Sequence, residues 1–137
     1  MEGEAIMIER EHFSGTWQRD RSFSPAVTTL GGKMVWVAGH GAPTDDKGNS
    51  LAGNFAAQAR QCFINMQVTL DRTGATLADL VTMTVFITDS RNGDEFTKIR
   101  GEFFAQDKCP ASALITCDGL AQPAMLVEIQ GIAVVEG

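Results

Sequence analysis

The chain has 137 residues, 44% of them apolar, which fits one domain with a substantial core. Its net charge is −6, and the eleven lysines and arginines are scattered along the chain. Because nucleic-acid backbones and anionic membrane surfaces both require clustered positive charge, neither is expected as a partner, and no apolar run is long enough to span a membrane.

Residues 1–20 form a variable, polar N-terminal segment in which a short strand is expected at 5–8. The acidic start lacks the basic-then-apolar order of a signal peptide, which predicts a cytoplasmic protein. Three cysteines without CxxC spacing agree with a reducing compartment. The only histidines are His12 and His40, and neither belongs to a metal-binding motif, so no metal and no cofactor is expected.

Two apolar runs, 26–30 and 33–38, flank the pair Gly31 and Gly32. Glycine readily adopts the positive φ angles that a two-residue turn requires. The pattern therefore predicts a β-hairpin in which the two runs pair with each other. A polar loop follows before the next periodic segment.

Two amphipathic helices are expected. Asn54 caps the first, 55–72, whose apolar residues recur on one stripe, so one face is buried. The second covers 94–104. Its inward residues are Phe96, Ile99 and Phe103.

Strands are expected at 81–88, 112–117 and 125–135, where apolar and polar residues alternate. With the hairpin and the two helices, the element order is β-β-α-β-α-β-β. This order predicts one α+β domain over 1–137, with a single sheet covered on one face by two helices. The uncovered face also carries apolar residues, which indicates contact between sheets of different subunits.

Glu128 is a carboxylate within an otherwise apolar strand. By parity it shares one face with Gln130 and Ile132, while Ile129 and Gly131 lie on the other. A carboxylate that loses water without gaining a partner is costly. Glu128 is therefore either an interface residue bridged to a neighbouring subunit or a functional group that holds a water and manages its proton.

Several segments resemble the Rid (YjgF) family of reactive-intermediate deaminases, namely 36–39, 55–61, 74–81, 110–114 and 127–134. The resemblance extends from about residue 21 to residue 135. It implies the chorismate-mutase-like Rid fold, a homotrimer with three clefts at the subunit boundaries, and a small-molecule ligand or substrate.

The family's binding residues are altered here. Ser112 stands where members active on 2-imino acids carry the arginine that holds the substrate carboxylate, and a hydroxyl is a weaker donor than a guanidinium. Phe23 replaces a tyrosine, His40 replaces an amide, and Gly39 matches. The resemblance thus implies a branch lacking the substrate-binding arginine. Arg21 and His40 are the candidate substitute anchors, and for each the alternative is a solvated loop side chain.

Two functions from different classes remain open. The first is a hydrolase acting on C=N bonds, an enamine or imine deaminase in which Glu128 is catalytic, on a substrate other than a 2-imino acid held by the usual arginine. The second is a non-catalytic trimer that binds or regulates through a small molecule. The endoribonuclease or translation-inhibitor role attached to some relatives ranks third, because the chain is acidic and has no catalytic histidine pair.

Overall fold

The computed structural model describes residues 8–137, so nearly all of the strand expected at 5–8 lies outside the described residues. From β2 onward, the element order is the one that the sequence predicts. The elements are β1 (Glu9–His12), β2 (Val27–Leu30), β3 (Lys33–Gly41), α1 (Phe55–Asp71), β4 (Leu80–Ile87), α2 (Gly93–Arg100), β5 (Ala111–Thr116) and β6 (Val127–Val135).

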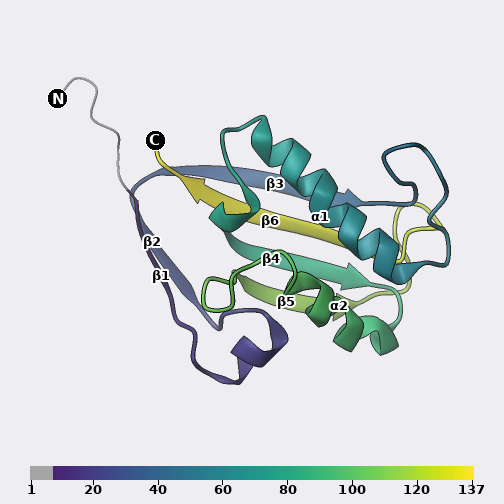
Figure 1. The fold of residues 1–137 in the computed structure, drawn as a ribbon, viewed down its shortest axis with the longest axis horizontal. Helices are drawn as coiled ribbons and strands as arrows, with labels where there is room; N and C mark the ends of the chain where they lie inside the picture. Colours follow the sequence, from purple (N-terminus) through teal and green to yellow (C-terminus); the bar gives the residue numbers. More distant parts are fainter. Residues whose placement is uncertain (1–7) are drawn as a thin grey trace.

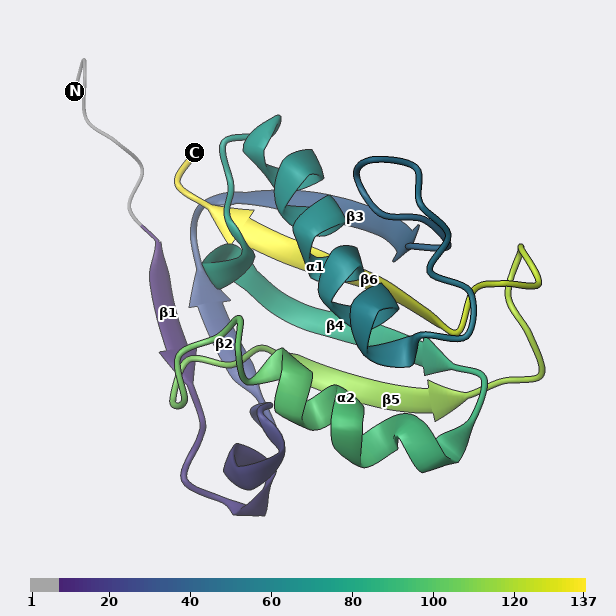
Figure 2. The same cartoon turned by 45° about the vertical axis from the view of Figure 1, so that its right-hand side comes forward.

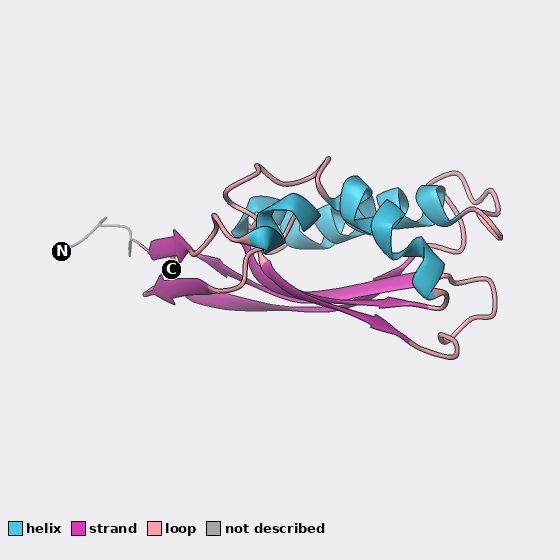
Figure 3. Cartoon of the chain, turned by 90° about the horizontal axis from the view of Figure 1, so that it is seen from below, coloured by secondary structure: helices cyan, strands magenta, loops and turns pink. Residues whose placement is uncertain are grey.

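The main sheet contains four strands in the order β3-β6-β4-β5, and only β4 and β5 are parallel. Both helices pack on the same face of this sheet, and the other face is bare (Figures 1 and 3). The predicted α+β architecture is confirmed. No helix among residues 8–137 is long and apolar enough to cross a membrane.

α1 begins where the sequence predicts and ends one residue earlier. The Asn54 side chain accepts a hydrogen bond from the amide of Ala57 at 3.1 Å, which satisfies one of the unpaired donors at the helix start. The stripe that the spacing predicts forms the centre of the core. Its buried members are Phe55, Ala59, Cys62, Phe63, Met66 and Leu70.

The expected hairpin is wrong. Gly31 and Gly32 do adopt positive φ angles of 78° and 83°, but β2 pairs with β1 in a separate two-stranded sheet, while β3 pairs with β6. The chain turns a corner between the two sheets at this glycine pair (Figure 2). A Cβ atom on Gly32 would lie 2.6 Å from the carbonyl oxygen of Val135, so the close approach to β6 also requires glycine.

α2 is shorter than predicted. It ends at Arg100, and the residues up to 104 form turns rather than a continued helix. Gly101 has the poor helix propensity that favours such an end. Phe96 and Ile99 are buried as expected, whereas Phe103 lies half-buried in the turn that follows.

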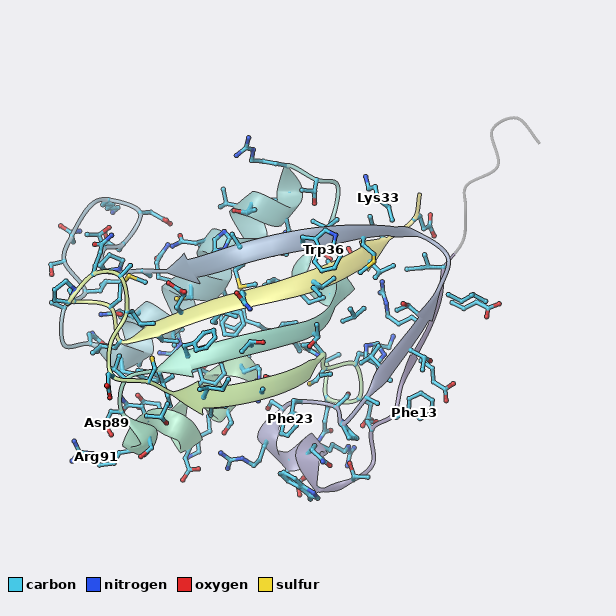
Figure 4. All side chains as sticks on the ribbon, turned by 180° about the vertical axis from the view of Figure 1, so that it is seen from behind. Phe13, Phe23, Lys33, Trp36, Asp89 and Arg91 are labelled. Carbon is cyan, nitrogen blue, oxygen red and sulfur yellow. The ribbon has the colours of Figure 1, made fainter. Side chains whose placement is uncertain are left out.

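The bare face of the main sheet is apolar. Trp36 is 72% exposed and Met34 is 52% exposed, both on β3, and Ile115 on β5 is 42% exposed. The Trp36 ring stands out from the sheet on this side (Figure 4). Large apolar side chains gathered on one face usually mark an interaction site.

Candidate functional site at two faces of the sheet

Most of the residues that the sequence singles out lie in two separate places, and His40 lies in neither of them. On the helix-covered side, Ser112 of β5 borders a cavity of about 190 Å³. On the open face, Glu128 of β6 lies against Gly39 of β3. The cavity is lined by Trp17, Arg21, Phe23, Thr97, Arg100, Ser112 and Leu114.

The strand register explains why these places are separate. Ser112 is level with Met83 on β4, whose side chain is buried beneath the helices. Glu128 is level with Phe86, three positions further along β4. Since neighbouring positions of a strand alternate between its faces, Ser112 and Glu128 point to opposite faces. One copy of the chain does not bring them together.

Arg100 is the central residue of the cavity, although it is not among the site residues predicted from the sequence. It lies at the end of α2 and is 1% exposed. Its Nη1 donates to Ser112 Oγ at 2.7 Å, and its Nη2 donates to the backbone oxygen of Arg21 at 3.0 Å. A guanidinium therefore does lie at Ser112, but it comes from a helix and not from the strand.

Aromatic rings hold this guanidinium on two sides. Its Cζ lies 5.4 Å from the ring centre of Phe23 and 5.1 Å from that of Phe96, both within cation–π range. Trp17 meets Phe23 edge to face, with 5.8 Å between the ring centres. Phe23 lacks the hydroxyl of the tyrosine that it replaces, but its ring lies over the guanidinium of Arg100.

The charge of Arg100 has no acidic partner. None of the five salt bridges among residues 8–137 includes it, and its buried Nε has no hydrogen-bond partner there. Burial lowers the pKa of Arg100 to about 10; Cys109 acts in the opposite direction, and the charge of Arg21 lowers it further. The group remains charged at neutral pH, so a desolvated cation with one unpaired donor borders the cavity.

A sequence feature does point to Arg100. It lies four residues after Phe96 and three before Phe103, which places it on the inward stripe of the predicted helix. Like Glu128 on its strand, Arg100 is a charged residue among the apolar residues of one face.

The side chain of Arg21 points elsewhere. Its Nη1 pairs with Asp94 Oδ1 at 3.0 Å near the protein surface. Arg21 therefore contributes to the cavity mainly through its backbone oxygen, which holds Arg100. The guanidinium that was expected as a substitute anchor is therefore already paired with a carboxylate.

Glu128 is half-buried and has no hydrogen bond or salt bridge among the described residues. A Cβ atom on Gly39 would lie 2.7 Å from Glu128 Oε2, so the carboxylate lies over the bare backbone of Gly39. The register of β3 against β6 shifts between Val37 and His40, and this irregularity includes Gly39. The glycine makes the room that the carboxylate occupies.

His40 lies on the helix side of the sheet, level with the buried Ile129. Its Nδ1 is 2.7 Å from the carbonyl oxygen of Ala38, and its Nε2 is 2.7 Å from Thr69 Oγ1 on α1. Because a carbonyl only accepts, Nδ1 is the donor to Ala38, and Nε2 is hydrogen-bonded with the threonine hydroxyl. The ring thus ties β3 to α1 and faces away from Glu128.

Metal ligands do not gather near either place. Within residues 8–137, no three histidine, cysteine, aspartate or glutamate side chains lie close enough together to hold a metal ion. Leu114 also lines the Arg100 cavity, so its wall there is apolar.

A family profile described as Endoribonuclease L-PSP matches residues 18–135. Among solved structures, the Rid family protein YyfB of Yersinia pestis, whose function is unknown, shares 25% identity with a TM-score of 0.81, covering 93% of this chain and 98% of that chain. Rv2704 of Mycobacterium tuberculosis, a member of the YjgF/YER057c/UK114 family, shares 28% identity with a TM-score of 0.64, covering 93% and 100%. Yeast Mmf1 shares 25% identity with a TM-score of 0.67, covering 82% and 86%.

The profile match extends over most of the chain, and the structures similar to it include proteins named for the Rid and YjgF groups. The helix-covered mixed sheet described above is the fold they share. The chain therefore belongs to the Endoribonuclease L-PSP family, the family of the Rid and YjgF proteins.

Proposed function

We propose that this protein is a hydrolase of C=N bonds whose substrate is a small imine or enamine carrying a carboxylate. The observation that carries the proposal is the buried, unpaired guanidinium of Arg100 at Ser112. A cation that has lost its water and has no acidic partner is stabilised by an anionic ligand. The sequence indicates Arg21 or His40 as the anchor in place of the family's arginine, and this proposal assigns that role to Arg100 of α2 instead.

The size of the cavity supports a small substrate. Its volume of about 190 Å³ suits a molecule of a few heavy atoms. One substrate oxygen would accept from the open Nε of Arg100, and Phe23 and Leu114 would contact the apolar part. This arrangement fits a short 2-imino acid better than a nucleotide.

The proton chemistry is assigned to Glu128 of a neighbouring copy. The apolar open face and the family's fold both support a trimer, in which the open face of one subunit meets the edge of the next. Water adds to the C=N carbon while Glu128 takes its proton and returns it to the nitrogen. Glu128 then takes the proton of the new hydroxyl group and passes it to the amine as the C–N bond breaks, which releases ammonia and leaves a ketone.

A non-catalytic binding trimer is the second candidate. The observation that favours it is the placement of Arg100 and Glu128 on opposite faces of one subunit. If assembly does not join them, the cavity binds an anion and no chemistry follows. An endoribonuclease role has less support, because the chain is acidic and His40 is held between Ala38 and Thr69.

The test is the release of ammonia and keto acid from 2-aminoacrylate generated in situ. The proposal expects release above the spontaneous rate, saturating with substrate. A rate equal to the background, together with measurable binding of a small carboxylate such as pyruvate, would favour the binding trimer instead.

Replacing Gly39 with alanine is expected to lower kcat by about 10- to 100-fold, since a displacement of roughly 1 Å at a reacting group has that effect. The new methyl group would contact Glu128 Oε2, and the flexible carboxylate would move aside. The melting temperature should change little. Gly119→Ala is the matched control, because a Cβ atom at Gly119 meets nothing within 4 Å. An unchanged kcat in Gly39→Ala would contradict the role given to Glu128.

A further inference from the structure

A second cavity, of about 370 Å³, lies between β1 and the turns that follow α2. It is larger than the Arg100 cavity, and the two share no lining residue. None of the site residues discussed above borders it. Its lining residues are Arg10, His12, Ala78, Phe103, Phe104, Ala105 and Lys108.

The charges at this second cavity are of one kind. Arg10, His12 and Lys108 are basic, and no lining residue is acidic, although the whole chain carries a net charge of −6. On β1 the acidic residues Glu9 and Glu11 alternate with the basic ones and are exposed. The strand thus directs its bases toward the cavity and its acids away from it.

Two of these bases have unmet hydrogen-bonding capacity. Arg10 Nε and His12 Nε2 are buried without a partner among residues 8–137. The rest of the Arg10 guanidinium is engaged, since Nη2 donates to the carbonyl oxygen of Val134 and Nη1 lies 3.6 Å from Asp79. A buried polar nitrogen without a partner is costly, and such groups usually mark the place of a ligand or water.

The field within the cavity also favours a negative ligand. Burial lowers the pKa of His12 below its ordinary value, and the positive charges of Arg10 and Lys108 lower it further. Arg10 and Lys108 therefore oppose a positive charge on His12, and an anion bound beside them would offset their repulsion.

The opposite wall is apolar and firmly held. Phe103 stacks on Phe63 with 4.6 Å between ring centres and an angle of 25°, and Phe104 meets Phe63 edge to face at 5.9 Å. Phe63 is fully buried in the core. A flat apolar group would find a preformed surface here, next to the basic side.

We propose that this second cavity is a binding site for a small organic anion, a carboxylate or phosphate carried on a flat apolar group. Arg10 Nε, His12 Nε2 and Lys108 would hold the anion, and Phe103 and Phe104 would contact the ring. The site is independent of the proposed hydrolase, because it uses none of the residues assigned to that reaction.

Calorimetric titration with phenyl phosphate and benzoate tests the proposal, with inorganic phosphate and phenol as the two half-probes. At least one whole probe should bind about tenfold or more tightly than either half, since anion and ring contacts add. Comparing the two whole probes shows which anion the site prefers. Equal affinity of phenyl phosphate and inorganic phosphate, together with no binding of benzoate, would overturn the proposal.

The Lys108→Gln variant tests whether the probes bind in this cavity. Lys108 is exposed, so the variant should fold normally, and phenyl phosphate or benzoate should bind it about fivefold or more weakly because a charged contact is lost. Lys98→Gln makes the same charge change on the exposed side of α2 and should bind like the parent. Binding that survives Lys108→Gln but is lost in Arg100→Met would place the probe in the other cavity and refute the assignment.

Discussion

Glu128→Gln is expected to abolish turnover of 2-aminoacrylate and to leave the fold and the assembly intact. Glutamine has the same shape but accepts no proton from water at neutral pH, and the loss of a general base lowers rates by about 10²- to 10⁴-fold. Because Glu128 has no hydrogen bond or salt bridge among the described residues, the substitution breaks no internal contact. Steady-state kinetics and the mass in solution measure the two effects.

Glu95→Gln is the control for the charge change, since Glu95 lies exposed on α2. Its kcat should equal that of the parent. If Glu128→Gln turned over substrate normally but became a monomer, Glu128 would be a bridge between subunits, and the hydrolase proposal would lose its proton acceptor.

Arg100→Met should separate function from stability. Methionine fills a similar volume, and replacing a buried charge with an apolar side chain is often neutral or stabilising. The melting temperature should therefore stay the same or rise. Binding of the carboxylate substrate should weaken by about 10- to 100-fold, because hydrogen bonds from a charged donor contribute roughly 1.5–3 kcal/mol. Thermal unfolding measures the expected effect on stability, and KM measures the expected effect on substrate binding.

Arg60→Met serves as the matched control. Arg60 pairs with Glu102 at 2.7 Å on the surface, where an ion pair contributes little, so neither KM nor melting temperature should change appreciably. A large drop in melting temperature for Arg100→Met with an unchanged KM would show instead that Arg100 is a structural residue.

Mixing the two impaired variants tests whether each site is shared between subunits. The Glu128→Gln and Arg100→Met variants are refolded together in equal amounts. A complete site needs Arg100 from a Glu128→Gln subunit and Glu128 from an Arg100→Met subunit. Each has an even chance of being in place, so about a quarter of the sites should be restored. No recovery would mean that both residues must come from one chain, which their opposite orientation disfavours.

Local patterns predicted much of this molecule. Asn54 and the apolar stripe behind it define α1, and strand parity correctly places Glu128 on the face opposite Ile129. In both cases the deciding interactions are short-range, either within one helix turn or between neighbours on a strand. The Gly31-Gly32 pair shows the limit, because a turn can be recognised locally while the partner of each strand is chosen by distant residues.

The site itself depended on such distant contacts. Arg100 reaches Ser112, twelve residues later, and the backbone of Arg21, seventy-nine residues earlier. No spacing in the sequence relates these three positions. The absence of an arginine at position 112 was visible in the sequence, but the guanidinium of Arg100 comes to lie there only when α2 packs against the sheet.

The hydrogen bond between Arg100 and Ser112 has an evolutionary consequence. A guanidinium on position 112 would compete with that of Arg100 for the same space and would repel it in a setting with little water. The two arginines are thus mutually exclusive solutions, and relatives with arginine on the strand should carry an uncharged residue at the helix position. A lineage that exchanged one arrangement for the other therefore passed through one of two intermediates. The first has neither arginine, and the second has both arginines and a destabilised fold.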